Sequence, residues 1–375
     1  MINCSEFVSM GHPDRTADAI ASYLLDEYIK HDPKVRFALE VQLKDHVCNL
    51  AGEVTSSWQP TVQEIESLVR DAIRLVGYTA EYAARWPKGS TLNADNVVVN
   101  NFIGQQSPDI AQGVNRDGWG DQGAFCGMAT DHPQFEFLPK DVYFARKIGT
   151  RLYEAAKEGK APIGLDIKTL VSVGEWMTVE QVIVAAPMKP EDEEAGKRFV
   201  TDVVNEVLAT RGHTAKEIII NGTGAYVVHS SVGDAGVVGR KLAVDFYGLN
   251  CPIGGGTTWG KDSTKADVTL NLAARYYSLQ TMLNTSYSNK KVFTKIACCI
   301  GRSECLLVQT NENGIIIRQQ NIDLKPSELI AKFGLRGEVK PNMFFSMCQR
   351  GLFYNVDEVA VCEIDENRNR YTSKA

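Results

Sequence analysis

The sequence predicts an α+β protein that contains three similar units of helices and strands. Three times along the chain, a stretch with apolar residues at helical spacing precedes two strand-like runs, and a further helix follows. Glycine is concentrated in the loops that connect these elements. Because a unit that recurs at long period is typical of a repeated architecture, the simplest fold has three sheets, each covered on one face by helices.

Each element is predicted from its apolar spacing or β-branched content and from the turn and capping residues that bound it. In the first helix the apolar residues stand at positions 17, 20, 21, 24, 25 and 28. The predicted elements, in chain order, are helix 14–30, strands 35–44 and 47–56, helix 61–77, strand 96–104, helix 141–159, strands 163–173 and 179–186, helix 191–210, strand 217–221, helix 264–284, strands 291–301 and 304–310, and a shorter helix from Pro326.

The three units define three predicted domains, which is a reasonable number for a chain of 375 residues. We place the first at residues 1–125, the central one at 126–240 and the C-terminal one at 241–375. These borders are soft, because the segments of neighbouring units interleave along the chain.

Composition and charge exclude several classes of protein. The chain has 40 basic and 46 acidic residues and a formal net charge of −6. Without a block of lysine and arginine, binding to a nucleic acid or a membrane surface is not expected, and an anionic small molecule would need a local basic cluster. The 9 cysteines are irregularly spaced, which is typical of reduced thiols. We see neither a secretion signal nor ~18 consecutive apolar residues, which predicts a cytoplasmic protein.

Two loops in the first third of the chain carry polar residues that no periodicity requires. His12 and Asp14 follow Gly11 at the start of the first helix. An acidic residue at that position either complements the helix dipole or holds a divalent cation beside a ligand. Residues 104–123 form a long loop rich in Gly, Pro, Asn and Asp. Such a loop is either a solvated connection or a lid over a polar substrate.

Two later loops bring cations together with glycines. Residues 221–241 end on Arg240-Lys241 and are either a hairpin with two bends or a loop that approaches an anion. The stretch 254–265 places Lys261 and Lys265 at a helix start, where anions are already favoured.

The carboxylate of Asp267 has two possible roles in this last loop. Thr264 would be the N-cap residue and Asp267 the third helical residue, which is the spacing of a capping box. The alternative is that Asp267 holds a cation beside the two lysines.

The same stretch nearly matches a phosphate-binding loop of the P-loop type. From Gly255 it reads G-x-x-x-x-G-K, but Asp262 stands where a magnesium-binding Ser or Thr should follow the lysine. Pro252 interrupts the strand that should lead into such a loop. A P-loop kinase is therefore a weaker hypothesis than a different kind of polyphosphate site.

Taken together, these loops resemble those of the S-adenosylmethionine synthetase family, the methionine adenosyltransferases. The family signatures G-H-P-D, G-x-G-D-Q-G and G-G-G-x-x-x-G-K-D-x-x-K-x-D match residues 11–14, 118–123 and 254–267, in that order. Shorter matches such as "QSPDIAQGV" and "GDAGVVGRK" extend the likeness over nearly the whole chain. The resemblance implies three α+β repeats in a pseudo-threefold arrangement, and a homodimer or homotetramer whose active sites lie between two subunits.

The resemblance also implies a reaction, in which ATP and L-methionine give S-adenosylmethionine. The methionine sulfur attacks the ribose C5′, and the displaced tripolyphosphate is then hydrolysed to pyrophosphate and phosphate. Because sulfur is already a good nucleophile, catalysis should come from alignment and from stabilisation of the anionic leaving group. The implied cofactors are two Mg²⁺ ions per site and K⁺.

Matching positions imply a role for each candidate residue, and the residues group by what they would bind. The implied catalytic positions are His12, Lys168, Arg240 and Lys261; the ATP-binding positions are His12, Asp166, Lys168, Tyr226, Asp234, Arg240, Lys241, Thr257 and Lys261; the methionine-binding positions are Glu53, Gln106, Asp121, Asp234 and Lys265; and the metal ligands are Asp14 and Asp267 for Mg²⁺ and Glu40 for K⁺. Residues 104–117 match the family's lid.

Four positions depart from the family pattern and mark a divergent member. Met10, Arg15, Ala225 and Val268 replace a usual Glu, Lys, Arg and Arg, and the lid is a few residues shorter. These changes leave open a second hypothesis, a catalytically silent homologue that binds nucleotide or regulates an active partner. Against it, none of the implied metal carboxylates or phosphate-binding lysines is missing.

Overall fold

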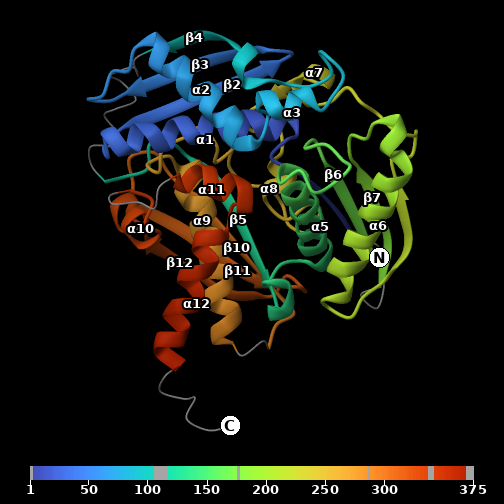
Figure 1. The fold of residues 1–375 in the computed structure, drawn as a ribbon. Helices are drawn as coiled ribbons and strands as arrows, with labels where there is room; N and C mark the ends of the chain where they lie inside the picture. The colour runs from blue at the N-terminus through green and yellow to red at the C-terminus, as the bar shows by residue number, and fades with distance from the viewer. Residues whose placement is uncertain (1–2, 105–116, 175–177, 286–287, 337–341, 369–375) are drawn as a thin grey trace.

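The computed structural model describes residues 3–104, 117–174, 178–285, 288–336 and 342–368. Figure 1 shows three sheets in separate sectors of the molecule, with helices packed between them. Each sheet has four strands, in the orders β4-β3-β2-β9, β1-β6-β7-β8 and β12-β11-β10-β5. Helices α1 and α2 contact the first sheet, α5 and α6 the second, and α9 the third.

The elements predicted from periodicity are all present with shifted ends, and the largest shift is in the strand predicted at 163–173, which begins at Lys168. The longer elements are α1 (Pro13–His31), β2 (Arg36–Lys44), β3 (Val47–Thr55), α2 (Val62–Val76), β4 (Val98–Gly104), α5 (Lys140–Lys157), β6 (Lys168–Val173), β7 (Val179–Ala185), α6 (Glu193–Ala209), β8 (Ala215–Ile220), α9 (Ala266–Asn284), β10 (Lys291–Cys298), β11 (Glu304–Asn311) and α10 (Pro326–Lys332).

Other elements lie outside the predicted set. They are β1 (Asn3–Val8), α3 (Ala80–Ala84), η1 (Ala94–Asn96), β5 (Gly123–Thr130), η2 (Pro133–Phe135), η4 (Pro190–Asp192), α7 (Ser230–Gly233), β9 (Gly236–Val237), α8 (Leu242–Asp245), β12 (Ile316–Asp323), α11 (Met343–Arg350) and α12 (Tyr354–Arg368).

The first two units share one topology, and the third departs from it. In each of the first two, an antiparallel hairpin is followed by a helix and by a strand that lies parallel to the second hairpin strand, as in β2-β3-α2-β4 and β6-β7-α6-β8. In the third unit, β12 follows the hairpin β10-β11 directly and pairs antiparallel with β11.

One edge of each sheet is completed by a strand from elsewhere in the chain. β1 pairs with β6, β5 pairs with β10, and β9 pairs with β2, all antiparallel. The three predicted domains therefore exchange strands, and the borders at 125/126 and 240/241 stay a prediction. The exchange also brings the segment that carries Arg240 and Lys241 to the sheet that follows α1.

Local signals explain where the helices of the first unit begin and end. Thr61 and Glu64 form a complete capping box at the start of α2, and Gly77, with a φ of 115°, ends that helix in the left-handed conformation.

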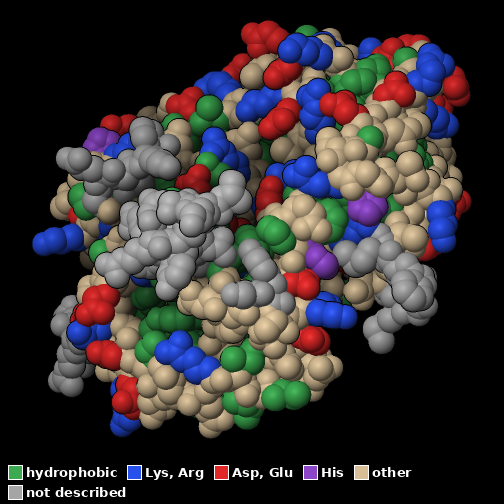
Figure 2. Space-filling view, turned by 90° about the horizontal axis from the view of Figure 1, so that it is seen from below, with side chains coloured by type: hydrophobic (Ala, Val, Ile, Leu, Met, Phe, Trp, Pro, Cys, Tyr) green, Lys and Arg blue, Asp and Glu red, His purple; other side chains and the backbone are tan. Residues whose placement is uncertain are grey.

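In the part of the chain that the structure describes, no helix is long and apolar enough to cross a membrane. Figure 2 shows acidic and basic side chains interspersed on the face it presents, in agreement with the mixed charge of the sequence.

Candidate active site

The loop before α1 and the loop before α8 meet around the carboxylate of Asp14. His12 is the N-cap residue of α1, and its Nδ1 accepts a hydrogen bond from the Asp14 N–H at 3.2 Å. Oδ2 of Asp14 lies 2.5 Å from Nζ of Lys241, and Oδ1 accepts from the Val237 N–H at 2.9 Å. The Arg240 guanidinium lies 3.7 Å from Oδ1. Two of the predicted loops thus form one cluster.

The charges in this cluster are fixed by burial and by the lysine. Burial lowers the pKa of His12 to about 3, and the positive charge of Lys241 adds to the effect. Burial alone would raise the pKa of Asp14, but the hydrogen bonds from Lys241 and Val237 outweigh it and lower that pKa. At neutral pH the site therefore presents a neutral imidazole beside an ionised carboxylate.

Asp166 and Tyr226 form a second wall of this cluster. Oδ2 of Asp166 accepts from the Ser230 N–H at 2.9 Å, and its carbonyl accepts from the Tyr226 hydroxyl at 3.2 Å. Burial raises the pKa of Asp166 to about 7, against the effect of the Ser230 hydrogen bond. The exposed Asp234 and the charges of Asp14 and Lys241 also act on this carboxyl, which places all of them within electrostatic reach.

Lys168 begins β6 in the second sheet, at the end of that sheet where β1 leads to His12. It pairs in register with Val8, shortly before His12, and its ammonium lies 2.6 Å from a carboxylate oxygen of Glu6. The charge of Lys168 also contributes to the lowered pKa of His12, after burial and Lys241.

A second cluster lies in the glycine-rich loop before α9. Oδ2 of Asp267 lies 2.6 Å from Nζ of Lys261, and Oδ1 accepts from the Gly256 N–H at 2.7 Å. Lys265 is the N-cap residue of α9 and makes no side-chain cap. Of the two roles considered for Asp267, the capping box is therefore wrong: the Thr264 hydroxyl donates to Asp262 at 2.6 Å, and Asp267 binds the loop through Gly256 and Lys261.

Asp262, the residue that breaks the P-loop pattern, has a structural role. It is fully buried, and its Oδ2 accepts from the Phe37 N–H of β2 at 2.9 Å. Its Oδ1 accepts from Thr264 and forms an ion pair with Arg336 at 2.7 Å. The residue after Lys261 thus fastens the loop to the first sheet, which is incompatible with the metal-binding role that a P-loop gives to that position.

The two clusters lie side by side in the molecule. Gly239, next to Arg240, has a φ of 80°, and a Cβ on it would lie 2.9 Å from the Thr257 Cβ. A larger residue would therefore push the loop of Arg240 away from the glycine-rich loop. Oγ1 of Thr257 accepts from the Trp259 N–H at 3.2 Å, which shapes the turn that leads to Lys261.

Sheet register brings two predicted glutamates toward Lys261. Lys261 forms an isolated bridge with Ala38 of β2, and Ala38 pairs with Glu53 of β3. Residues directly opposite in neighbouring strands share a face, so Lys261, Glu53 and the exposed Glu40 lie on the open face of the first sheet. Glu53 also pairs with Gly104, where the predicted lid begins.

Of the remaining methionine-binding candidates, the structure describes Asp121 but not Gln106. Asp121 is exposed, its Oδ1 accepts from the Gln122 N–H at 2.7 Å, and its carbonyl accepts from the Cys298 thiol at 3.5 Å. Burial raises the pKa of Cys298 to about 11, and Asp121 and Asp267 both add to this shift, so both carboxylates lie within electrostatic reach of Cys298. Gln106 and residues 105–116 of the predicted lid lie outside the described part of the chain.

The positions that depart from the family pattern are mostly buried. Met10 and Val268 are 3% and 0% exposed, and Ala225 packs against the core. Arg15 forms ion pairs with Asp18 and Asp245 inside the protein. Sequence reasoning missed Asp18 and Asp245. The i, i+4 spacing of Asp14 and Asp18 is a signal that could have found the first of them.

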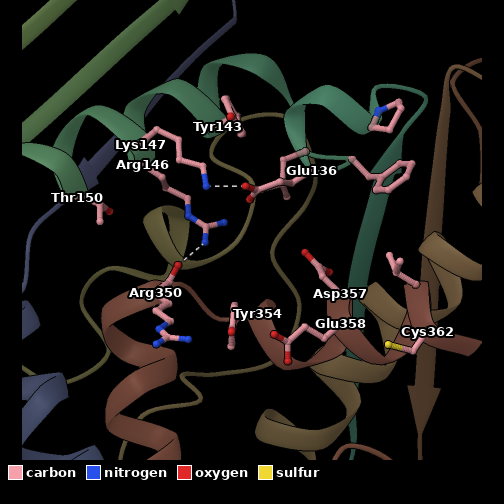
Figure 3. Close-up of a pocket in the computed structure, with 14 residues that line it drawn as sticks. Glu136, Tyr143, Arg146, Lys147, Thr150, Arg350, Tyr354, Asp357, Glu358 and Cys362 are labelled. Carbon is pink, nitrogen blue, oxygen red and sulfur yellow. Dashed lines mark hydrogen bonds and ion pairs between the residues drawn. The ribbon is translucent and has the colours of Figure 1, made fainter. Parts of the chain in front are cut away.

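One cavity of the described residues lies away from these clusters. It has a volume of about 750 Å³ and lies between α5 and α12, where Figure 3 shows Arg146 and Lys147 pointing toward Arg350 and Glu136. None of the predicted site residues lines it. The candidate site is therefore defined by polar loops and not by this cavity.

Comparison with known proteins identifies each part of the chain. Family models for the N-terminal, central and C-terminal domains of S-adenosylmethionine synthetase match residues 1–108, 116–226 and 228–359. The S-adenosylmethionine synthase of Wolinella succinogenes is 35% identical over 326 residues, which cover 83% of this chain and 81% of the relative. That of Sulfurovum sp. is 35% identical over 324 residues, which cover 83% and 80%.

A solved structure gives the same result for the fold. It is described as an unusual S-adenosylmethionine synthetase from Campylobacter jejuni, with a TM-score of 0.85 and 28% identity, and the match covers 98% of this chain and 99% of that one. The predicted α+β class with three repeats and the predicted enzyme class, a methionine adenosyltransferase, are confirmed. Because all three domain models match in order over most of its length, the chain belongs to the S-adenosylmethionine synthetase family.

Proposed function

We propose that this protein synthesises S-adenosylmethionine from ATP and L-methionine. The sulfur of methionine attacks the ribose C5′, and the released tripolyphosphate is hydrolysed to pyrophosphate and phosphate. The single observation that carries the proposal is the pairing of Asp14 with Lys241 and of Asp267 with Lys261, in two adjoining glycine-rich loops. Each loop offers cations and one carboxylate, which is the chemistry that a metal-bound polyphosphate needs.

Charge stabilisation and alignment supply the catalysis of the first step. The neutral imidazole of His12 would lie near the O5′ that leaves, and Lys168 would neutralise the charge that develops there. Arg240, Lys241 and Lys261 would grip the phosphate chain. No general base is needed, because the sulfur carries a free electron pair and bears no proton.

The carboxylates present fit magnesium that is shared with a substrate. Mg²⁺ is commonly held by one or two carboxylates and completed by phosphate oxygens and water. Among the described residues, no three His, Cys, Asp or Glu side chains gather into a metal-binding group, so the protein offers single carboxylates rather than a closed cage. Asp14 and Asp267 would each hold one Mg²⁺, which neutralises phosphate charge when bound, and Glu40 would contribute to a K⁺ site.

The substrate ends would be recognised by different walls of the site. Tyr226 would stack on adenine, with Asp166 and Thr257 nearby on the ATP side. Glu53, Gln106, Asp121, Asp234 and Lys265 would bind the ammonium and carboxylate of methionine. The segment 104–117 would act as a lid. Asp166 is held by Ser230 and Tyr226, which supports a fixed nucleotide wall.

We also propose that the active site is completed by a second copy of the chain, in a homodimer or a homotetramer. Exposed apolar side chains on the outer strand β4 support this assembly, since Val98 and Phe102 are 58% and 69% exposed. Large apolar groups at such positions are typical of a surface that another protein covers. Glu53 and Glu40, on the open face of the same sheet, would then face the partner.

The proposal is tested by product formation. The purified protein, supplied with ATP, methionine, Mg²⁺ and K⁺, is expected to form S-adenosylmethionine, measured by mass spectrometry. Omission of methionine is the control. Absence of the product, with folded protein and all components present, would contradict the proposal.

A further inference from the structure

Arg15 occupies a buried position where segments of the candidate active site meet. Its side chain is 3% exposed. Nη1 lies 3.1 Å from Oδ2 of Asp18, one turn along α1, and Nη2 lies 2.5 Å from Oδ1 of Asp245, the last residue of α8. The residue that follows Asp14 thus joins α1 to the segment that follows Lys241.

The carboxylate of Asp18 also holds the loop that carries Arg240. Oδ1 of Asp18 accepts a hydrogen bond from the Gly239 N–H at 2.8 Å. Gly239 directly precedes Arg240, so this bond fixes the backbone that presents the guanidinium. Arg15 and the loop therefore share one carboxylate, with one oxygen for each.

The carboxylate of Asp245 holds the glycine-rich loop in the same way. Oδ2 of Asp245 accepts from the indole N–H of Trp259 at 2.8 Å, two residues before Lys261. The Arg15 guanidinium lies 5.7 Å from the centre of the Trp259 ring. The indole is therefore held at its N–H by Asp245 and at its ring by Arg15, and Trp259 is only 1% exposed.

Only a guanidinium can make all of these contacts. It presents several N–H groups in a planar fork and can stack on an aromatic ring, whereas the ammonium of lysine is a compact point charge on a flexible chain of four carbons. The cation is also needed electrostatically. Burial acts to raise the pKa of Asp18, and of the neighbouring charges Arg15 favours ionisation while Asp245 opposes it. Without Arg15, two buried carboxylates would lack compensation.

We propose that Arg15 is a positioning residue that sets the distance between Asp14 and the two loops that carry Arg240 and Lys261. It acts through Asp18 on Arg240 and through Asp245 and Trp259 on Lys261. The inference deepens the proposed function and rests on it, because the distance matters only if these cations grip one polyphosphate together. At this position the resemblance leads us to expect Lys, and in this chain the guanidinium contacts Asp18, Asp245 and the Trp259 ring.

The test compares R15K with a matched control on the surface. Arg74 of α2 also bridges two carboxylates, with Nη1 2.7 Å from Asp71 and Nη2 2.7 Å from Asp95, but its side chain is 41% exposed. R74K is therefore the same chemical change at an arginine that also pairs with two carboxylates, away from the site. For each variant we would measure kcat, the KM for methionine, thermal unfolding, and the affinity for magnesium tripolyphosphate by calorimetry.

R15K is expected to lower kcat by about 10- to 100-fold, because small misplacements of charged groups near a reacting centre have effects of this size. It should weaken tripolyphosphate binding while the KM for methionine stays unchanged, and R74K should match the wild type in all four measurements. W259F, which keeps an aromatic ring but loses the indole N–H, should lower kcat less, and its effect should be non-additive with that of R15K.

Equal kcat and equal tripolyphosphate affinity in R15K and R74K would overturn the positioning role. So would a loss of activity in R15K that only follows a loss of folded protein. If the wild type forms no S-adenosylmethionine, the proposed function fails, and the calorimetry still decides the inference. Weaker tripolyphosphate binding by R15K than by R74K then supports it, and equal or absent binding contradicts it.

Discussion

The Asp14 carboxylate lies 2.5 Å from the Lys241 ammonium, although 227 positions separate the two residues in the chain. The contact exists because β9 adds to the edge of the sheet that follows α1 and carries the next loop with it. Without a bound polyphosphate, the carboxylate and the lysine neutralise each other. In the proposed reaction both would turn to the substrate, one through Mg²⁺ and one directly.

Replacement of Asp14 by Asn should remove the proposed metal ligand while keeping the size of the side chain. We expect kcat to fall by about 100-fold or more, since one strong charge is lost at the phosphate chain. Turnover at saturating Mg²⁺ measures the effect. D45N is the control, because Asp45 pairs with its neighbour Lys44 on the surface at 2.7 Å. Full activity in D14N would remove this residue from the mechanism.

Lys261→Ala should affect turnover far more than stability. The side chain is 22% exposed and, among the described residues, is paired with Asp267, so the variant loses a partly exposed ion pair that contributes little to stability. We expect kcat to fall by about 100-fold, while the free energy of unfolding changes by about 0.5 kcal/mol or less. K216A is a matched control, because Lys216 is 65% exposed and pairs with Glu180 at 2.6 Å. A variant that unfolds easily but turns over normally would contradict the phosphate role.

Asp262→Ser separates the two interpretations of the glycine-rich loop. A serine completes the P-loop pattern and should improve a P-loop kinase. In this structure it leaves Arg336 and the Phe37 N–H without their buried partner, so the free energy of unfolding should fall by about 3 kcal/mol. Urea unfolding measures it, with D71S as the surface control. A stable D262S with increased phosphate transfer would favour the kinase.

The lowered pKa of His12, to about 3, predicts that stability falls with acidification. In the unfolded chain this imidazole titrates near the ordinary value of 6.5. The stabilisation is complete above pH 6.5 and is lost as the pH falls toward 3, because the unfolded state then binds a proton that the folded state does not.

Urea unfolding of the wild type and of H12N, at neutral pH and near pH 5, isolates this contribution. Asn is a suitable control residue because it can still cap α1. The wild type should lose more stability than H12N between the two conditions. Equal losses would mean that His12 does not titrate differently in the folded and unfolded states.

The helices and hairpins could be predicted because their signals are local. Thr61, Glu64 and Gly77 mark the ends of α2, and alternating burial runs through β2. The strands β1, β5 and β9 could not be predicted in the same way. Each pairs with a segment far away in the chain, and β9 has only 2 residues. A strand that is stabilised by a distant partner leaves little trace in its own sequence.

The site residues were predicted by motif, but what several of them contact was not. Asp267 matched a capping pattern and proved to bind Gly256 and Lys261 instead, because the loop folds back over the helix start. Asp262 stands at the position that breaks the P-loop pattern, and in the structure it is a buried carboxylate that accepts a hydrogen bond from the Phe37 N–H. Both outcomes depend on how the loop crosses β2, which is a tertiary feature that local spacing cannot give.

The measurement that tests the central claim most directly is the stoichiometry of phosphate release. With ATP, methionine, Mg²⁺ and K⁺, we predict equal amounts of S-adenosylmethionine, phosphate and pyrophosphate, and no release when methionine is omitted. Formation of ADP would indicate a kinase, and ATP binding without turnover would indicate a catalytically silent homologue. Either result would contradict the proposal that the two carboxylate–lysine loops form a methionine adenosyltransferase site.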